Sequence, residues 1–190
     1  MAAAPAVLVM AGAARPRAEL RELLGDERAA GVERLLVARA TEWADALGEE
    51  RATVAGADEG VGDALARAFD RVAGDRPVVV VWPVLACWRS EHAFAVLDDL
   101  DAGCEASVGP VFDSGLYLLA LARPIPEVLE LPADAWASPN VIGLVLAPIN
   151  DAGVAVGLVR AERALRRPGD VRAAVADPLL DDELRALLAG

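Results

Sequence analysis

The sequence predicts an α/β fold with three layers and a mostly parallel central sheet. Two observations carry this prediction. Apolar stretches of strand length alternate with segments of helical periodicity through four repeats, and a pair of strands follows late in the chain. The 190 residues, 55% of them hydrophobic, suffice for one sizeable core, and no linker interrupts them. We therefore expect a single domain over residues 1–190.

The expected strands are short apolar runs. The clearest one covers residues 77–82, which is rich in valine and uncharged. The run 116–121 is apolar without alternation, which is typical of a strand buried on both faces. The remaining strands are expected at 5–11, 52–55, 104–108 and 154–159.

The expected helices follow from apolar residues spaced three and four apart. Asp26 and Ser90 are predicted N-caps, and Ser138 with Pro139 predicts a further helix start. His92, the only histidine, lies in the first turn of one helix, where we expect a surface residue. The helices are expected at 20–24, 26–48, 63–74, 90–100, 138–153, 168–176 and 181–188.

Composition excludes several classes of function. The net charge is −12, and the chain contains arginine but no lysine, which excludes Schiff-base and phosphate-loop lysine chemistry. An acidic protein is repelled by phosphate backbones and by anionic membranes, so we expect neither nucleic acid nor a membrane as a partner. Cys87 and Cys104 have no paired spacing and no leader sequence precedes them, which favours reduced thiols in the cytoplasm.

A turn at residues 109–115 leads into the apolar run 116–121 and carries one acidic side chain, Asp113. Open α/β sheets bind ligands where strands end, so Asp113 is the candidate catalytic residue, facing a cleft. The alternative is a turn former whose carboxylate accepts a hydrogen bond from a nearby backbone N–H, with Gly115 supplying an unusual backbone angle. The sequence leaves both interpretations open.

The 82–88 loop, Trp-Pro-Val-Leu-Ala-Cys-Trp, is unusually apolar for the exit of a strand. Either the fold covers it or it lines an apolar surface. In the second case Trp82 and Trp88 are candidates for an interface with another protein or a second copy of the chain.

Four segments, 23–29, 64–69, 109–119 and 138–168, resemble a known family. Its members look like Gly-Pro-x-x-Asp-Gly-Gly-Tyr-Tyr-Leu-Leu at the central turn. Asp113 and Gly115 match this pattern, whereas Ser114 and Leu116 do not. The chain resembles small bacterial nucleotide-diphospho-sugar-transferase-like proteins with the GT-A fold, which are akin to phospholactate guanylyltransferases.

This resemblance implies a cleft for a nucleotide sugar or a nucleoside triphosphate at the strand ends. The loop after the first strand would hold the nucleotide, which makes Gly12, Arg15 and Arg17 candidate binding residues. That loop is shortened here and lacks the Lys-Thr of the family pattern.

The resemblance also implies a divalent metal on the diphosphate, but the acidic ligands of the family are replaced here. Val84 stands where the family has an aspartate, and residues 164–168 read Ala-Leu-Arg-Arg-Pro in place of Asp-x-Asp-Thr-Pro. We therefore predict that the metal site is lost, and we assign no cofactor. A metal-dependent nucleotidyltransferase would have to use Asp58 and Glu59, the only loop acids near suitable strand ends.

Arg166 and Arg167 occupy the place of the lost acids. With Arg15 and Arg17 they could neutralise a diphosphate directly, because a guanidinium group binds phosphate through two hydrogen bonds. The alternative is a solvated cluster that nearby carboxylates balance.

Two functions remain. The first is a transferase acting on a nucleotide-linked donor, by glycosyl or nucleotidyl transfer and without the usual metal. The second is a non-catalytic binding or assembly protein that uses the 82–88 loop. Arg166, Arg167 and Asp113 on one cleft would favour the transferase, whereas an apolar cleft filled by Trp82 and Trp88 would favour the binding protein.

Overall fold

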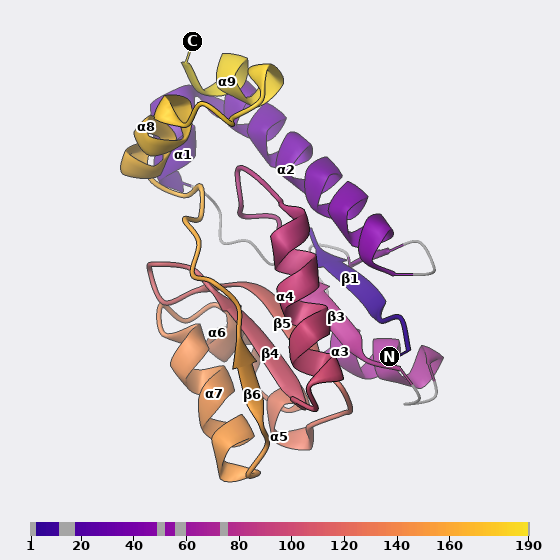
Figure 1. Cartoon of the computed structure of the whole chain (residues 1–190). Coiled ribbons are helices and arrows are strands. Elements are labelled where there is room, and N and C mark those ends of the chain that lie inside the picture. Colours follow the sequence, from indigo (N-terminus) through magenta and orange to yellow (C-terminus); the bar gives the residue numbers. More distant parts are fainter. Residues whose placement is uncertain (1–2, 12–17, 49–51, 56–59, 73–75, 190) are drawn as a thin grey trace.

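A computed structural model describes residues 3–11, 18–48, 52–55, 60–72 and 76–189. These residues form a six-stranded sheet with the order β2-β1-β3-β5-β4-β6 (Figure 1). The strand β5 runs antiparallel to both neighbours, and the other pairings are parallel. The predicted α/β class with a mostly parallel sheet is confirmed. The strands are β1 (Ala6–Met10), β2 (Thr53–Ala55), β3 (Val78–Val81), β4 (Ala106–Pro110), β5 (Leu116–Leu121) and β6 (Val156–Leu158).

Helices flank this sheet. In Figure 1 α4 crosses in front of the central strands, and α2 runs alongside β1, against which it packs. The helices α3, α5, α6 and α7 form a second group that pack against one another. No helix in the described part of the chain is both long and apolar enough to cross a membrane. The helices are α1 (Ala18–Leu24), α2 (Asp26–Leu47), α3 (Val61–Arg71), α4 (Ser90–Asp101), α5 (Pro126–Leu129), α6 (Ala133–Trp136), α7 (Val141–Asp151), α8 (Pro168–Ala176) and α9 (Asp182–Ala189).

The centre of the sheet is its most buried part. Every residue of β3 and of β5 is buried, as expected for strands covered on both faces. These two strands pair with each other, from Val78 opposite Leu121 to Val81 opposite Leu118. Their apolar side chains leave water together on folding, and this burial is the main driving force for the fold.

The strand β5 has one more residue than its partner β4 near the turn that joins them. The register of β4 and β5 runs from Gly109 opposite Leu118 directly to Pro110 opposite Leu116, so Tyr117 has no partner of its own. A β-bulge of this kind turns the extra side chain away from the regular alternation. The Tyr117 ring consequently lies 5.3 Å from the ring of His92 on α4, measured between centroids.

A second apolar cluster lies beyond the sheet, where α1, α8 and α9 pack around one end of α2 (Figure 1). Leu36, Leu165 and Leu184 are buried in it. Leu165 belongs to the segment between β6 and α8, and its N–H donates to the Val84 carbonyl at 2.7 Å. This segment therefore joins the sheet to the second cluster.

Most element boundaries agree with the sequence, and the bounds of β5 and α8 agree at both ends. One helix start is wrong: α7 begins at Val141, because the Ser138 hydroxyl accepts a hydrogen bond from the Asn140 N–H at 3.1 Å in a turn before it. Both predicted N-caps are one residue late: the N-cap of α2 is Gly25, with φ of 78°, rather than Asp26, and the N-cap of α4 is Arg89 rather than Ser90. The prediction of one domain over residues 1–190 stays a prediction.

Candidate functional site

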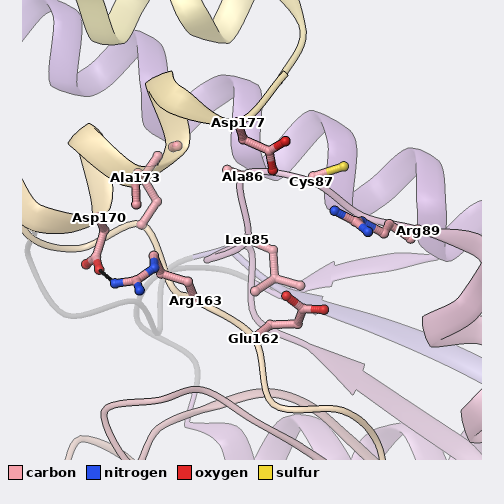
Figure 2. Close-up of a pocket in the computed structure, with 11 residues that line it drawn as sticks. Leu85, Ala86, Cys87, Arg89, Glu162, Arg163, Asp170, Ala173 and Asp177 are labelled. Carbon is pink, nitrogen blue, oxygen red and sulfur yellow. Dashed lines mark hydrogen bonds and ion pairs between the residues drawn. The ribbon is translucent and has the colours of Figure 1, made fainter. Parts of the chain in front are cut away.

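A pocket of about 150 Å³ opens between the segment after β3, the segment before α8, and α8 itself (Figure 2). The strand β3 ends at this edge of the sheet together with its parallel neighbour β1, which is where open α/β sheets bind ligands. Apolar atoms form part of the wall, and charged side chains form the rest. The lining residues are Leu85, Ala86, Cys87, Arg89, Glu162, Arg163, Leu165, Asp170, Ala173, Ala174 and Asp177.

The Asp113 carboxylate contacts the Arg166 guanidinium. These are two of the three groups whose meeting on one cleft would favour the transferase. The Arg166 Nη1 atom lies 3.3 Å from each Asp113 carboxylate oxygen. The two side chains are 33% and 24% exposed for Arg166 and Asp113, so water and ligands can reach both. Neither side chain lines the pocket, although Arg166 directly follows the lining residue Leu165.

The turn takes its unusual backbone angle at Ser114, with φ of 66°, and not at Gly115, which corrects the expectation from sequence. Gly115 has a different task. A Cβ atom there would lie 2.8 Å from Val111 Cγ2 and 2.9 Å from Arg166 Nη1. The missing side chain therefore leaves the space in which Arg166 approaches the turn and reaches Asp113.

Arg167 does not join this pair. Its side chain is exposed and does not line the pocket, while its backbone N–H donates to Asp170 Oδ2 at 2.9 Å. The same oxygen accepts from the Arg166 N–H at 3.2 Å, so Asp170 caps the start of α8. Asp170 Oδ1 accepts from Arg163 Nη1 at 3.2 Å. Asp170 thus pairs with the Arg163 side chain and meets Arg166 and Arg167 only through their backbone N–H groups, and whether Arg166 and Arg167 form only a solvated cluster stays open.

His92 is buried, with 2% of its surface exposed, so the prediction of a surface residue is wrong. Its Nδ1 atom accepts a hydrogen bond from the Arg89 N–H at 3.3 Å, which leaves the proton on Nε2. That Nε2 donates to Glu162 Oε1 at 3.1 Å. The Arg160 Nε atom donates to the same carboxylate oxygen at 2.9 Å. Two donors on the same oxygen therefore hold the Glu162 carboxylate at the pocket wall.

The backbone fixes Glu162 next to the Asp113 turn. The Glu162 N–H donates to the Pro110 carbonyl at 3.0 Å, and the Phe112 N–H donates to the Glu162 carbonyl at 3.0 Å. Beneath it the Tyr117 hydroxyl donates to the Arg160 carbonyl at 3.0 Å. Burial raises the pKa of the Tyr117 phenol above its ordinary value, and the Glu162 carboxylate raises it further.

The fold covers the first part of the 82–88 loop: residues 82–85 are buried, Ala86, Cys87 and Trp88 are half-buried, and Leu85, Ala86 and Cys87 line the pocket. Trp82 is buried and stacks on Trp136, with ring centroids 6.1 Å apart, so its assignment to an exposed interface is wrong. Trp88 is half-buried and packs 4.7 Å from Trp43 and 5.8 Å from Tyr117 between centroids. Packing inside the chain thus accounts for the aromatic character of this loop.

Several predicted residues lie outside the described part of the chain: Gly12, Arg15 and Arg17 of the first loop, and Asp58 and Glu59. Their roles stay predictions. Within the described residues, no group of three or more His, Cys, Asp or Glu side chains is arranged to hold a metal ion. The predicted loss of the metal site stays a prediction as well.

Comparison with solved structures identifies the fold. The chain superposes on a provisionally assigned nucleotide-diphospho-sugar transferase from Desulfovibrio desulfuricans G20 with a TM-score of 0.75. The match covers 98% of this chain and 94% of that one, at 18% sequence identity. The chain has a nucleotide-diphospho-sugar-transferase fold. No family model matches the sequence, and no curated protein matches it.

Sequence reasoning missed three side chains of this site: Arg89, His92 and Glu162. Arg89 and His92 are close in sequence, but Glu162 comes from 70 residues after His92, and an isolated β-bridge between Glu162 and Val111 holds it at the Asp113 turn. One signal was available. His92 stands at the third position of a helix that begins directly after an apolar loop, and there a side chain can accept a hydrogen bond from the backbone N–H before the helix.

Proposed function

We propose that this protein is a transferase that acts on a nucleotide-linked donor, by glycosyl or nucleotidyl transfer, and does so without the usual divalent metal. The contact between Arg166 and Asp113 carries the proposal. It brings a cation and a carboxylate together, at the turn before β5 in a nucleotide-diphospho-sugar-transferase fold. The kinship with phospholactate guanylyltransferases that the sequence implies belongs to this proposal too.

Arg166 supplies the charge in this proposal. A diphosphate leaving group carries concentrated negative charge, which a metal ion or a cation of the protein has to offset. The Arg166 guanidinium is one-third exposed and donates to Asp113 through a single nitrogen, so its other N–H groups can donate hydrogen bonds to the oxygens of a diphosphate. Asp113 then faces the hydroxyl groups of the sugar or ribose. Arg15 and Arg17 of the first loop lie outside the described residues, and their part in offsetting this charge stays a prediction.

A second candidate is a non-catalytic relative that binds a partner. One observation favours it: Arg160, Arg163 and Arg166 each contact a carboxylate of the same chain, which lowers the charge available to a phosphate. The partner would be another protein or a second copy of this chain. The buried Trp82 gives no support to the 82–88 loop as the surface for it.

The test is a thermal-unfolding screen against nucleoside di- and triphosphates and nucleotide sugars, each with a chelator and with magnesium or manganese. A ligand at a hundredfold excess over its dissociation constant stabilises the folded state by about 2.7 kcal/mol, a shift of several degrees. We expect stabilisation in the chelator that disappears in Arg166→Ala.

Arg123→Ala is the matched control for this screen, because Arg123 forms an arginine–carboxylate pair with Glu105 before β4, at the opposite edge of the sheet. If no nucleotide stabilises the protein under any condition, the transferase proposal fails and the partner-binding candidate takes its place. Stabilisation that requires metal contradicts the metal-free part of the proposal.

A further inference from the structure

Arg89 is a cation in the wall of the pocket. The Arg89 backbone is fixed, because its N–H donates to His92 Nδ1 and its carbonyl accepts from Trp43 Nε1 at 2.9 Å. Its half-buried side chain points into the pocket (Figure 2). Among the ion pairs of the described residues, none includes the Arg89 guanidinium. A partly desolvated guanidinium gains from binding an anion there.

The same pocket also contains two carboxylates, of Asp177 and Glu162, that can accept further hydrogen bonds. Asp177 Oδ1 accepts a hydrogen bond from the Leu179 N–H at 2.9 Å, and within the described residues its carboxylate has no ion-pair partner. Glu162 uses Oε1 for His92 and Arg160, and no described donor binds its Oε2. The pocket therefore offers a cation for an anionic group and separate acceptors for hydroxyl groups.

We propose that this pocket binds a small molecule that carries one anionic group, a carboxylate or a phosphate monoester, together with at least one hydroxyl group. Arg89 binds the anion, and Glu162 and Asp177 accept from the hydroxyls. The volume, about 150 Å³, admits a molecule of about the size of a benzene ring. This inference rests on the proposed function and adds to it: the molecule is the acceptor of the transfer.

Cys87 provides the test, because it lines the pocket, whereas Cys104 lies before β4 at the other edge of the sheet. The rate at which a thiol reagent alkylates each cysteine is measured by mass spectrometry without nucleotide. The probes are glycerate and glycerol 3-phosphate, which separate the carboxylate from the phosphate source, with glycerol and propionate as controls that lack the charge or the hydroxyls. We expect one or both anionic probes to slow alkylation of Cys87 and to leave Cys104 unchanged.

The variant Arg89→Gln should weaken this protection at least about tenfold, because a charge-assisted hydrogen bond is lost. Arg123→Gln should leave it intact. The proposal is overturned if no anionic probe protects Cys87, if glycerol or propionate protects it equally well, or if Arg89→Gln leaves the protection unchanged. Because no nucleotide is present, such a failure leaves the donor-binding proposal standing, and failure of the nucleotide screen leaves this result intact.

Discussion

The Tyr117 side chain reaches the interior because β5 has an extra residue at this point, and its hydroxyl donates to the Arg160 carbonyl. Burial raises the pKa of this phenol above its ordinary value of about 10, so the folded protein keeps a proton that the unfolded chain releases. The phenol therefore stabilises the fold fully below about pH 10, and this stabilisation is lost as the pH rises toward the pKa of the folded state.

The chain suits a direct measurement, because Tyr117 is its only tyrosine and lysine is absent. We expect the free energy of unfolding to fall by up to about 1.4 kcal/mol per pH unit above about pH 10. Urea titrations at a series of alkaline pH values measure this fall. In Tyr117→Phe the same series should be nearly flat. Parallel curves for the two proteins would show that Tyr117 is not responsible.

Ser114 adopts a backbone conformation that favours glycine, and glycine is the residue that the family pattern has there. Ser114→Gly should raise the free energy of unfolding by up to about 1 kcal/mol, because the left-handed strain of a non-glycine residue exceeds the extra chain entropy of glycine. Ser114→Val should lower it, since a branched side chain fits this region worst. Thermal unfolding of both variants tests whether Ser114 has a positive φ. If Ser114→Gly is less stable than the unmodified protein, this backbone conformation is contradicted.

The surroundings of some site residues could be predicted from the sequence, and those of others could not. Asp113 could be placed in a turn at a strand end because local signals, Gly109 to Gly115, mark such turns. His92 could not be recognised as buried, because its hydrogen-bond partner Glu162 is brought to it only by the tertiary fold.

Among the elements, the segment before α8 has the largest effect on the site, because it carries Glu162, Arg163 and Arg166 and is anchored at Leu165. The Leu165 side chain is 1% exposed and lies in the cluster formed by α1, α2, α8 and α9. Leu165→Ala should lower the free energy of unfolding by about 2–5 kcal/mol, the usual range for truncating a buried leucine side chain. Leu179→Ala is the control: that side chain is 65% exposed, and its loss should cost less than about 0.5 kcal/mol.

Chemical denaturation measures both changes. Equal stabilities of the two variants would contradict the anchoring role of Leu165, since the difference predicted between them depends on burial alone.

Elements with strong local signals were predicted well, and elements without them were not. The apolar run of β5 and the proline start of α8 specify their boundaries almost unaided. The four-residue helices α5 and α6 are too short for a periodic pattern, and α7 starts late because a serine turn precedes it. The packing of Trp82 and Trp88 could not be predicted, because their partners Trp43, Tyr117 and Trp136 come from three distant elements.

For the molecule as a whole, the order of strands and helices was enough to predict the fold class, and the superposition over 98% of the chain agrees with it. The pocket was not predictable in the same way. Its walls come from the segment after β3, the segment before α8 and α8 itself, and its charged residues follow no motif. Local patterns specify a layered α/β arrangement, whereas a site depends on which loops meet at one edge.

The central claim is that the Arg166 guanidinium, without a metal ion, binds the diphosphate of a nucleotide-linked donor. Calorimetric titration in a chelator, with the nucleotide that stabilises the protein most, tests this claim directly for the unmodified protein, Arg166→Gln and Arg123→Gln. We expect binding that Arg166→Gln weakens at least about tenfold and Arg123→Gln leaves unchanged. Binding that appears only with magnesium or manganese, or that is equal in all three proteins, would contradict the claim.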